Sequence, residues 1–135
     1  MAPLLGQRRR LADTLAGFDE AAWSAQSRCT AWSNRDVVVH LSITTRFWTH
    51  SIVQARLGRP TRMLAEFDPV EDPAALVRAA PRVSAADTLA GYRSTTEALA
   101  DCLADLRPEE WALPAESPLG HVPVTILAHQ ALWDG

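Results

Sequence analysis

A single long helix between residues 33 and 57 constrains this chain more than any other feature of its sequence. Ser33 and Asp36 form a capping-box-like start, because the hydroxyl can accept from a free backbone N–H and the acid sits where the helix dipole favours it. Gly58 and Pro60 end the helix. Two neighbouring stripes run along it, one of Val37, Leu41, Thr44, Trp48 and Ile52 and one of Asp36, His40, Ile43, Phe47 and His50. Two adjacent, largely apolar stripes predict a central position in a helical bundle.

Three further helices are predicted by the same spacing of apolar residues. The first spans about residues 3–18, and the fourth begins near Pro123 and still runs at Gly135. The third begins at Ser84, with Asp87 in its first turn, and carries a stripe of Leu89, Tyr92, Thr96, Leu99, Leu103 and Leu106. No segment shows a convincing strand pattern. We therefore expect an all-α four-helix bundle with shallow packing angles.

A long connection separates the second helix from the third. Residues 58–83 contain four prolines, and Asp72-Pro73 favours a short helix because Asp caps and Pro fits the first turn. Connections of this length in small domains are often functional or cross from one side of the fold to the other. The expected bundle therefore has a long crossover between helices 2 and 3.

Charge and composition exclude several classes of function. The net charge of −3 argues against nucleic-acid binding, and the run Arg8-Arg9-Arg10 is interpreted as a solvated helix face. No apolar run is long enough to cross a membrane, and the N-terminus lacks the order of a secretory signal. Cys29 and Cys102 are interpreted as reduced thiols of a cytoplasmic protein. The 23 Ala and 13 Arg, with no Lys, are typical of a GC-rich, actinobacterial genome.

Two polar side chains occupy stripes that are otherwise apolar. Asp134 aligns with Leu127 and Ala131 on the fourth helix. Burying a lone carboxylate costs several kcal/mol, so Asp134 must be paired, hydrogen-bonded or metal-bound, unless the helix end frays and leaves it in water. His40, inside the run VVVHL, is either a core histidine bonded to a neighbouring helix or a metal ligand.

The other candidates are weaker. His50 is expected at a rim, His121 in an exposed loop, and His129 off the face of Asp134. Asp36 is assigned to the helix cap rather than to orienting His40. Phe47 and Trp48 either fill the core or wall a cavity. The sequence contains no GxSxG, P-loop, GxGxxG or HExxH motif, so it gives no support to the corresponding enzymes.

At these residues the chain resembles a known family. The segment around "SRCTAWSNRDVVVHL" is similar to the mycothiol-dependent maleylpyruvate isomerase N-terminal domain family, within the wider DinB-like four-helix bundles. The similarity continues through "ADTLAGYRSTTEALADCLADLRPEEW" and "SPLGHVPVTILAHQALWDG", and so covers nearly the whole chain. The matching motif positions are Trp23, Cys29, Trp32, Asp36, His40 and Leu41.

The resemblance implies a divalent metal, most often zinc, held by three side chains. His40 corresponds to the ligand of the second helix and Asp134 to the acid of the fourth, which a His follows four residues later in the family. This chain ends at Gly135 and lacks that His, and Ala31 stands where the family has Gly. Residues 1–135 are therefore expected to be one domain of this type with its last helix cut short. Either the chain is a fragment or its metal site is incomplete.

Two functions follow as expectations. The resemblance implies a thiol-using isomerase or S-transferase, in which the metal-bound thiolate of mycothiol adds to an electrophilic small molecule. Its partners would be that electrophile and the low-molecular-weight thiol. The alternative is a non-catalytic helical module that binds a ligand or forms a homodimer, and the absent third ligand favours it.

Overall fold

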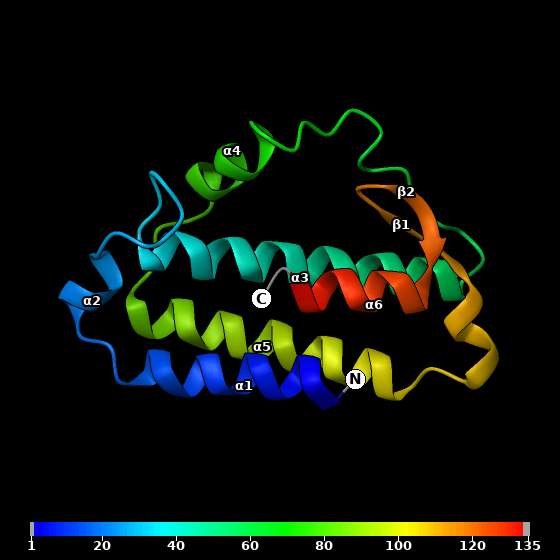
Figure 1. Ribbon diagram of the computed structural model, residues 1–135, viewed down its shortest axis with the longest axis horizontal. Coiled ribbons are helices and arrows are strands. Elements are labelled where there is room, and N and C mark those ends of the chain that lie inside the picture. Colours follow the sequence, from blue (N-terminus) through cyan, green and yellow to red (C-terminus); the bar gives the residue numbers. More distant parts are fainter. Residues whose placement is uncertain (1, 134–135) are drawn as a thin grey trace.

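The computed structural model describes residues 2–133, which are mostly helical as the sequence predicts. Four helices lie alongside one another in Figure 1: α1, α3, α5 and α6. The elements in chain order are α1 (Ala2–Ala16), α2 (Glu20–Ser24), α3 (Asn34–Arg56), α4 (Asp72–Ala79), α5 (Ala85–Ala104), the 3-10 helix η1 (Pro108–Ala112), β1 (Pro114–Ser117), β2 (Gly120–Pro123) and α6 (Val124–Trp133). Within this range no helix combines the length and the apolar character needed to cross a membrane.

Both ends of α3 follow from local sequence signals. The Asp36 backbone N–H donates to Ser33 Oγ at 3.2 Å, and the Ser33 N–H donates to Asp36 Oδ2 at 3.0 Å. This capping box confirms the assignment of Asp36 to the cap. At the other end Gly58 takes a φ of +70°, which glycine adopts without steric cost. That turn lets the Arg59 N–H reach back to the Gln54 carbonyl at 2.9 Å.

The core lies between α3 and the three helices beside it. α3 contacts α5, α6, α4, α2 and β1, which matches the central position predicted for it. Its first stripe supplies Leu41, Trp48 and Ile52, all at most 3% exposed. The predicted stripe of α5 also faces inward. Among the fully buried partners are Tyr92, Leu99, Leu103, Leu127 and Ala131.

Arg8 corrects the expectation that the arginine run is a solvated face. Arg9 and Arg10 are exposed, but Arg8 is only 1% exposed. It shares the inner face of α1 with Leu4 and Ala12, four residues away on either side. Its Nη1 donates to Thr45 Oγ1 at 2.7 Å and its Nη2 to the Ala131 carbonyl at 3.1 Å. One guanidinium therefore joins α1 to α3 and α6.

A β-hairpin between η1 and α6 is the second departure from the sequence analysis, which predicted no strands. β1 and β2 pair antiparallel, with Pro114 opposite Pro123 and Ser117 opposite Gly120. The Ser117 hydroxyl donates to the Gly120 carbonyl at 2.9 Å, and the Ser51 hydroxyl on α3 donates to the Glu116 carbonyl at 2.8 Å. Four-residue strands framed by prolines show too little alternation for a sequence pattern to reveal them.

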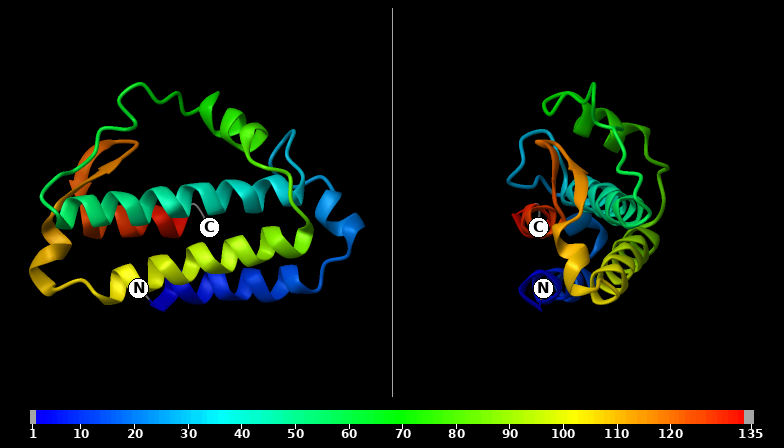
Figure 2. Two further views of the ribbon diagram at one scale, coloured as in Figure 1. Left: turned by 180° about the vertical axis from the view of Figure 1, so that it is seen from behind. Right: turned by 90° about the vertical axis from the view of Figure 1, so that its right-hand side faces the viewer.

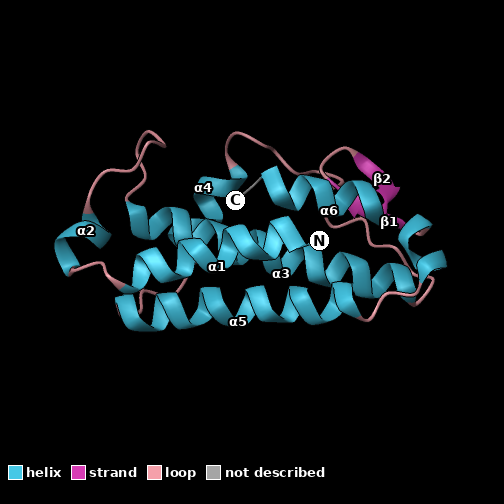
Figure 3. Cartoon of the chain, turned by 60° about the horizontal axis from the view of Figure 1, so that its bottom comes forward, coloured by secondary structure: helices cyan, strands magenta, loops and turns pink. Residues whose placement is uncertain are grey.

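The connection between α3 and α5 crosses over α3, as Figures 1 and 2 show. It leaves the end of α3 beside the hairpin, runs back along the outer side of that helix, and forms α4 before α5 begins. The predicted helix after Asp72-Pro73 is confirmed as α4. Figure 3 shows that α4 and the hairpin lie toward opposite ends of this crossover. The crossover thus covers a face of α3 that the core does not use.

Candidate functional site

A groove of about 960 Å³ lies under the crossover. Its floor comes from α3, and its walls come from the connection, α4, the hairpin turn and the end of α6. This volume lies at the upper end of the range for small-molecule sites. The lining residues are His40, Ile43, Thr44, Arg46, Phe47, Trp48, His50, Met63, Leu64, Phe67, Pro69, Asp72, Pro73, Ala75, Leu76, Pro118, Gln130 and Trp133.

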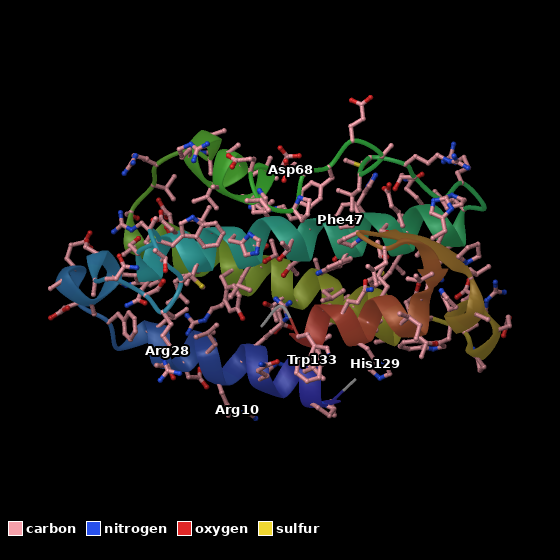
Figure 4. All side chains as sticks on the ribbon, turned by 45° about the horizontal axis from the view of Figure 1, so that its top comes forward. Arg10, Arg28, Phe47, Asp68, His129 and Trp133 are labelled. Carbon is pink, nitrogen blue, oxygen red and sulfur yellow. The ribbon has the colours of Figure 1, made fainter. Side chains whose placement is uncertain are left out.

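The second stripe of α3 forms the floor. His40, Ile43, Phe47 and His50 all line the groove, while Asp36 at the head of the stripe caps the helix. The stripe therefore borders a cavity, and Phe47 also packs against the buried core. Figure 4 shows Phe47 on the side of α3 that lies under the connection, near Asp68. The sequence left open whether Phe47 and Trp48 fill the core or wall a cavity. Trp48 does both, because it is 3% exposed and also lines the groove.

His40 is half-buried and lies against Trp32. The two ring centroids are 5.0 Å apart and the planes are inclined by 48°. Two side chains hold the backbone of Trp32 in place. Its carbonyl oxygen accepts hydrogen bonds from the Gln26 side-chain amide at 2.9 Å and from the Ser27 hydroxyl at 2.8 Å. The residue before it, Ala31, has a φ of +69°, in the left-handed region that favours glycine. The loop thus places an indole over the histidine at the cost of a strained alanine.

Glu116 anchors the wall formed by the connection. The residue is only 4% exposed, and its carboxylate accepts three hydrogen bonds. Oε1 accepts from Thr61 Oγ1 at 2.7 Å and from the Met63 N–H at 2.8 Å, and Oε2 accepts from the Leu64 N–H at 2.9 Å. Burial alone would raise the pKa of Glu116, but these bonds to the charged form outweigh it and lower the pKa. A side chain of the hairpin therefore fixes the segment that carries Met63 and Leu64 into the groove.

The structure describes the positions of the four histidines but not that of Asp134. His40 lines the groove, and Asp134 lies outside the described residues. His50 is exposed and also lines the groove. His121 is exposed as predicted, but it lies on β2 with its Nε2 2.7 Å from the Thr61 carbonyl oxygen. His129 is exposed on α6.

The described residues do not complete a metal site by themselves. Nowhere in residues 2–133 do three or more His, Cys, Asp or Glu side chains gather closely enough to hold an ion. His40, His50 and Asp72 all line the groove without forming such a group. A neutral imidazole is a common zinc ligand, so His40 suits the role chemically. A site that holds an ion by three such side chains, His40 among them, would need a donor from outside this range, and Asp134 is the predicted one.

Sequence reasoning missed the residues of the connection that wall the groove. Met63, Leu64, Phe67 and Leu76 lie within a proline-rich segment that was predicted only to be a long crossover with a short helix after Asp72-Pro73. The sequence does contain a sign of this wall, because large apolar side chains in a surface connection indicate that the connection packs against another part of the protein. Glu116 gave no such signal, since its partners lie more than fifty residues away in the chain.

These features define the class of protein. The model of the family described as mycothiol maleylpyruvate isomerase N-terminal domain matches residues 4–133, and the chain belongs to that family. The resemblance carried by Trp32, Asp36 and His40 is thereby confirmed. A comparison with curated proteins finds no match.

Two solved structures share the fold. One is a crystal structure of the mycothiol-dependent maleylpyruvate isomerase, with a TM-score of 0.72 at 15% sequence identity. The other is a variant of that isomerase in which alanine replaces one histidine, with a TM-score of 0.75 at 14% identity. Each comparison covers 96% of this chain and 57% of the solved chain. The chain therefore spans little more than half the length of these enzymes, and the similarity establishes its DinB-like helical fold.

Proposed function

We propose that this chain is a metal-dependent, thiol-using enzyme of the mycothiol-dependent isomerase or S-transferase type. The observation that carries the proposal is the position of His40, on the floor of a roomy groove and against Trp32. In a member of this family, that is the histidine expected to serve the reaction centre. A histidine needed only for packing would be enclosed by the core, whereas His40 borders a cavity.

His40 and Asp134 are the proposed ligands of a divalent ion, with zinc as the expected metal. Asp134 continues in sequence the stripe of α6 whose members Leu127 and Ala131 are at most 1% exposed. Arg8 supports the arrangement, because it bonds Thr45 on α3, the helix of His40, and Ala131 on α6, the helix that ends one residue before Asp134 in the sequence. When bound, such a metal lowers the pKa of a coordinated thiol.

The chain itself would bind the electrophile and shield it from water. In the proposed reaction the thiolate sulfur of mycothiol forms a bond to an electrophilic carbon. In an isomerisation, that addition removes a cis double bond, rotation follows, and loss of the thiolate restores the double bond as trans. In a transfer, the sulfur–carbon bond remains, and either the adjacent carbon takes up a proton, which completes an addition, or a leaving group departs with the electron pair of the bond that breaks. The apolar floor at Ile43 and Phe47 and the wall at Phe67 would exclude water from the reacting atoms.

A non-catalytic binding or dimerisation module is the second candidate. It is favoured by the lack, within residues 2–133, of three clustered candidate ligands. Under either candidate we propose that residues 1–135 form one four-helix-bundle domain of a cytoplasmic protein. Cys29 and Cys102 are both free thiols, which agrees with a reducing compartment.

The first test measures zinc bound after purification without added metal. We compare the parent with His40→Ala and with His129→Ala, a control whose histidine is exposed on α6 and does not line the groove. The proposal predicts bound zinc in the parent and the control and a loss of at least tenfold in affinity for His40→Ala. Equal zinc in all three proteins would remove His40 from the site. Absence of zinc from all three would favour the non-catalytic module.

A further inference from the structure

We infer that the groove selects a bulky, predominantly apolar electrophile with at most one negative charge, in preference to a small dicarboxylate. The inference rests on the proposed function, whose electrophile it specifies. It follows from the chemistry of the groove lining, its charges and its size, and each of these restricts the ligand in a different way.

The lining is dominated by apolar side chains. Twelve of its eighteen residues are apolar, and only six carry a polar or charged group. Several of the apolar groups are open to the groove and to solvent: Met63 is 65% exposed and Leu76 48% exposed. A ligand with apolar surface would cover these groups and remove them from water. The apolar members are Ile43, Phe47, Trp48, Met63, Leu64, Phe67, Pro69, Pro73, Ala75, Leu76, Pro118 and Trp133.

The charges of the groove do not suit a dianion. Among the described residues, Arg46 is the single arginine of the lining, and Asp72 brings an opposite charge into the same groove. Carboxylates are recognised best by paired or bidentate cationic groups. One carboxylate could use Arg46, but the other basic side chains of the described lining are the imidazoles of His40, the proposed metal ligand, and His50, and neither offers a second carboxylate a bidentate partner. Charge complementarity therefore allows a neutral or monoanionic ligand.

The size of the groove leads to the same class. A groove of about 960 Å³ accommodates a drug-sized molecule, and a short dicarboxylate would leave most of the apolar wall uncovered. Gln130 and Thr44 are uncharged polar side chains of the lining that could orient such a ligand by hydrogen bonds.

The test compares two unsaturated carboxylates of different class. Cinnamate is an aromatic monoanion and fumarate a small dianion. Each would compete with the fluorescent probe anilinonaphthalene sulfonate for the parent protein in the absence of any thiol. The inference predicts that cinnamate binds at least tenfold more tightly than fumarate. Fumarate binding as tightly as cinnamate, or no probe binding at all, would overturn it.

A matched pair of variants locates the binding. Leu76→Arg places a cation in the groove, and Val83→Arg places one on the same connection at a side chain that is 44% exposed and does not line the groove. Leu76→Arg should weaken cinnamate at least fivefold and improve fumarate, while Val83→Arg should match the parent. Equal effects of the two variants would place the binding elsewhere. Light scattering tests whether a second copy of the chain occupies the groove. A parent dimer that Leu76→Arg dissociates and Val83→Arg does not would contradict the inference.

The outcome can be separated from that of the proposed function. Binding is measured without thiol, before and after treatment with a chelator. A protein that lacks zinc but still prefers cinnamate would refute the metal-dependent reaction and leave the ligand class standing. A zinc protein that prefers fumarate would refute the ligand class alone.

Discussion

The hydrogen bonds of Glu116 allow a quantitative test of how the groove wall is held. The perturbation is Glu116→Gln, which preserves the shape of the side chain and removes its charge. The carboxylate accepts from Thr61, Met63 and Leu64 at 2.7–2.9 Å. An amide has one acceptor oxygen, so it can satisfy Thr61 and Met63 at that oxygen but must present N–H groups to the Leu64 N–H.

The expected loss of stability is about 3–5 kcal/mol. Hydrogen bonds to a charged group contribute about 1.5–3 kcal/mol each and neutral ones about 0.5–1.5 kcal/mol, so each of the two retained bonds loses about 1 kcal/mol. The Leu64 N–H, left facing another donor, costs a further 1–3 kcal/mol or so. For a chain of this length such a loss lowers Tm by roughly 10–18 °C.

Urea denaturation measures the free energy of unfolding, and amide hydrogen exchange locates the effect. Exchange at Met63 and Leu64 should accelerate in Glu116→Gln more than exchange in the core of α5. Glu66→Gln is the control, since Glu66 is exposed on the same connection and its replacement should change stability by about 0.5 kcal/mol or less. A loss below about 1 kcal/mol in Glu116→Gln, or unchanged exchange at both amides, would refute the account of the wall.

Three further predictions concern acid stability, backbone strain and the thiols. Backbone and side-chain hydrogen bonds from Arg107 lower the pKa of Glu110 from 4.5 to about 2. The stability that the charged carboxylate contributes to the fold is therefore complete above pH 4.5 and is lost as the pH falls toward 2. Over this range the urea midpoint should fall less steeply in Glu110→Gln than in the parent. Ala31→Gly should stabilise the protein by roughly 0.5–1 kcal/mol in the same assay, because the left-handed cost of alanine exceeds the extra unfolded-state entropy of glycine, and a destabilised variant would contradict the strain. Burial raises the pKa of Cys102 whereas Cys29 is exposed, so a thiol reagent should label one cysteine quickly and the second only after unfolding, and two fast thiols would show that Cys102 is accessible.

Features set by neighbouring residues could be predicted from the sequence. The Ser33 cap, the end of α3 at Gly58 and the start of α4 at Asp72 depend on residues a few positions apart. The stripes of α3 and α5 were also found, because a helix imposes its own period on buried positions. The sequence indicated that His40 lay on a second, less typical stripe, and the structure shows that this stripe faces a groove.

Features set by distant partners could not be predicted. Arg8 was taken as exposed because a charged run usually is, yet its partners Thr45 and Ala131 stand 37 and 123 residues away. The hairpin and the Glu116 anchor likewise depend on contacts made only in the folded chain. The groove itself arises from where the crossover lies, which local periodicity does not determine.

The most direct test of the central claim is the titration of the thiol of mycothiol in the presence of this protein loaded with zinc. Ultraviolet absorbance of the thiolate, corrected for the protein alone, gives the pKa of the thiol. With the parent protein we expect a pKa of the thiol at least about one unit below the value near 8.5 of a free cysteine-type thiol, and with His40→Ala no such shift. A thiol that titrates identically with parent protein, with His40→Ala and in buffer would contradict the claim that His40 helps to build a thiol-activating site.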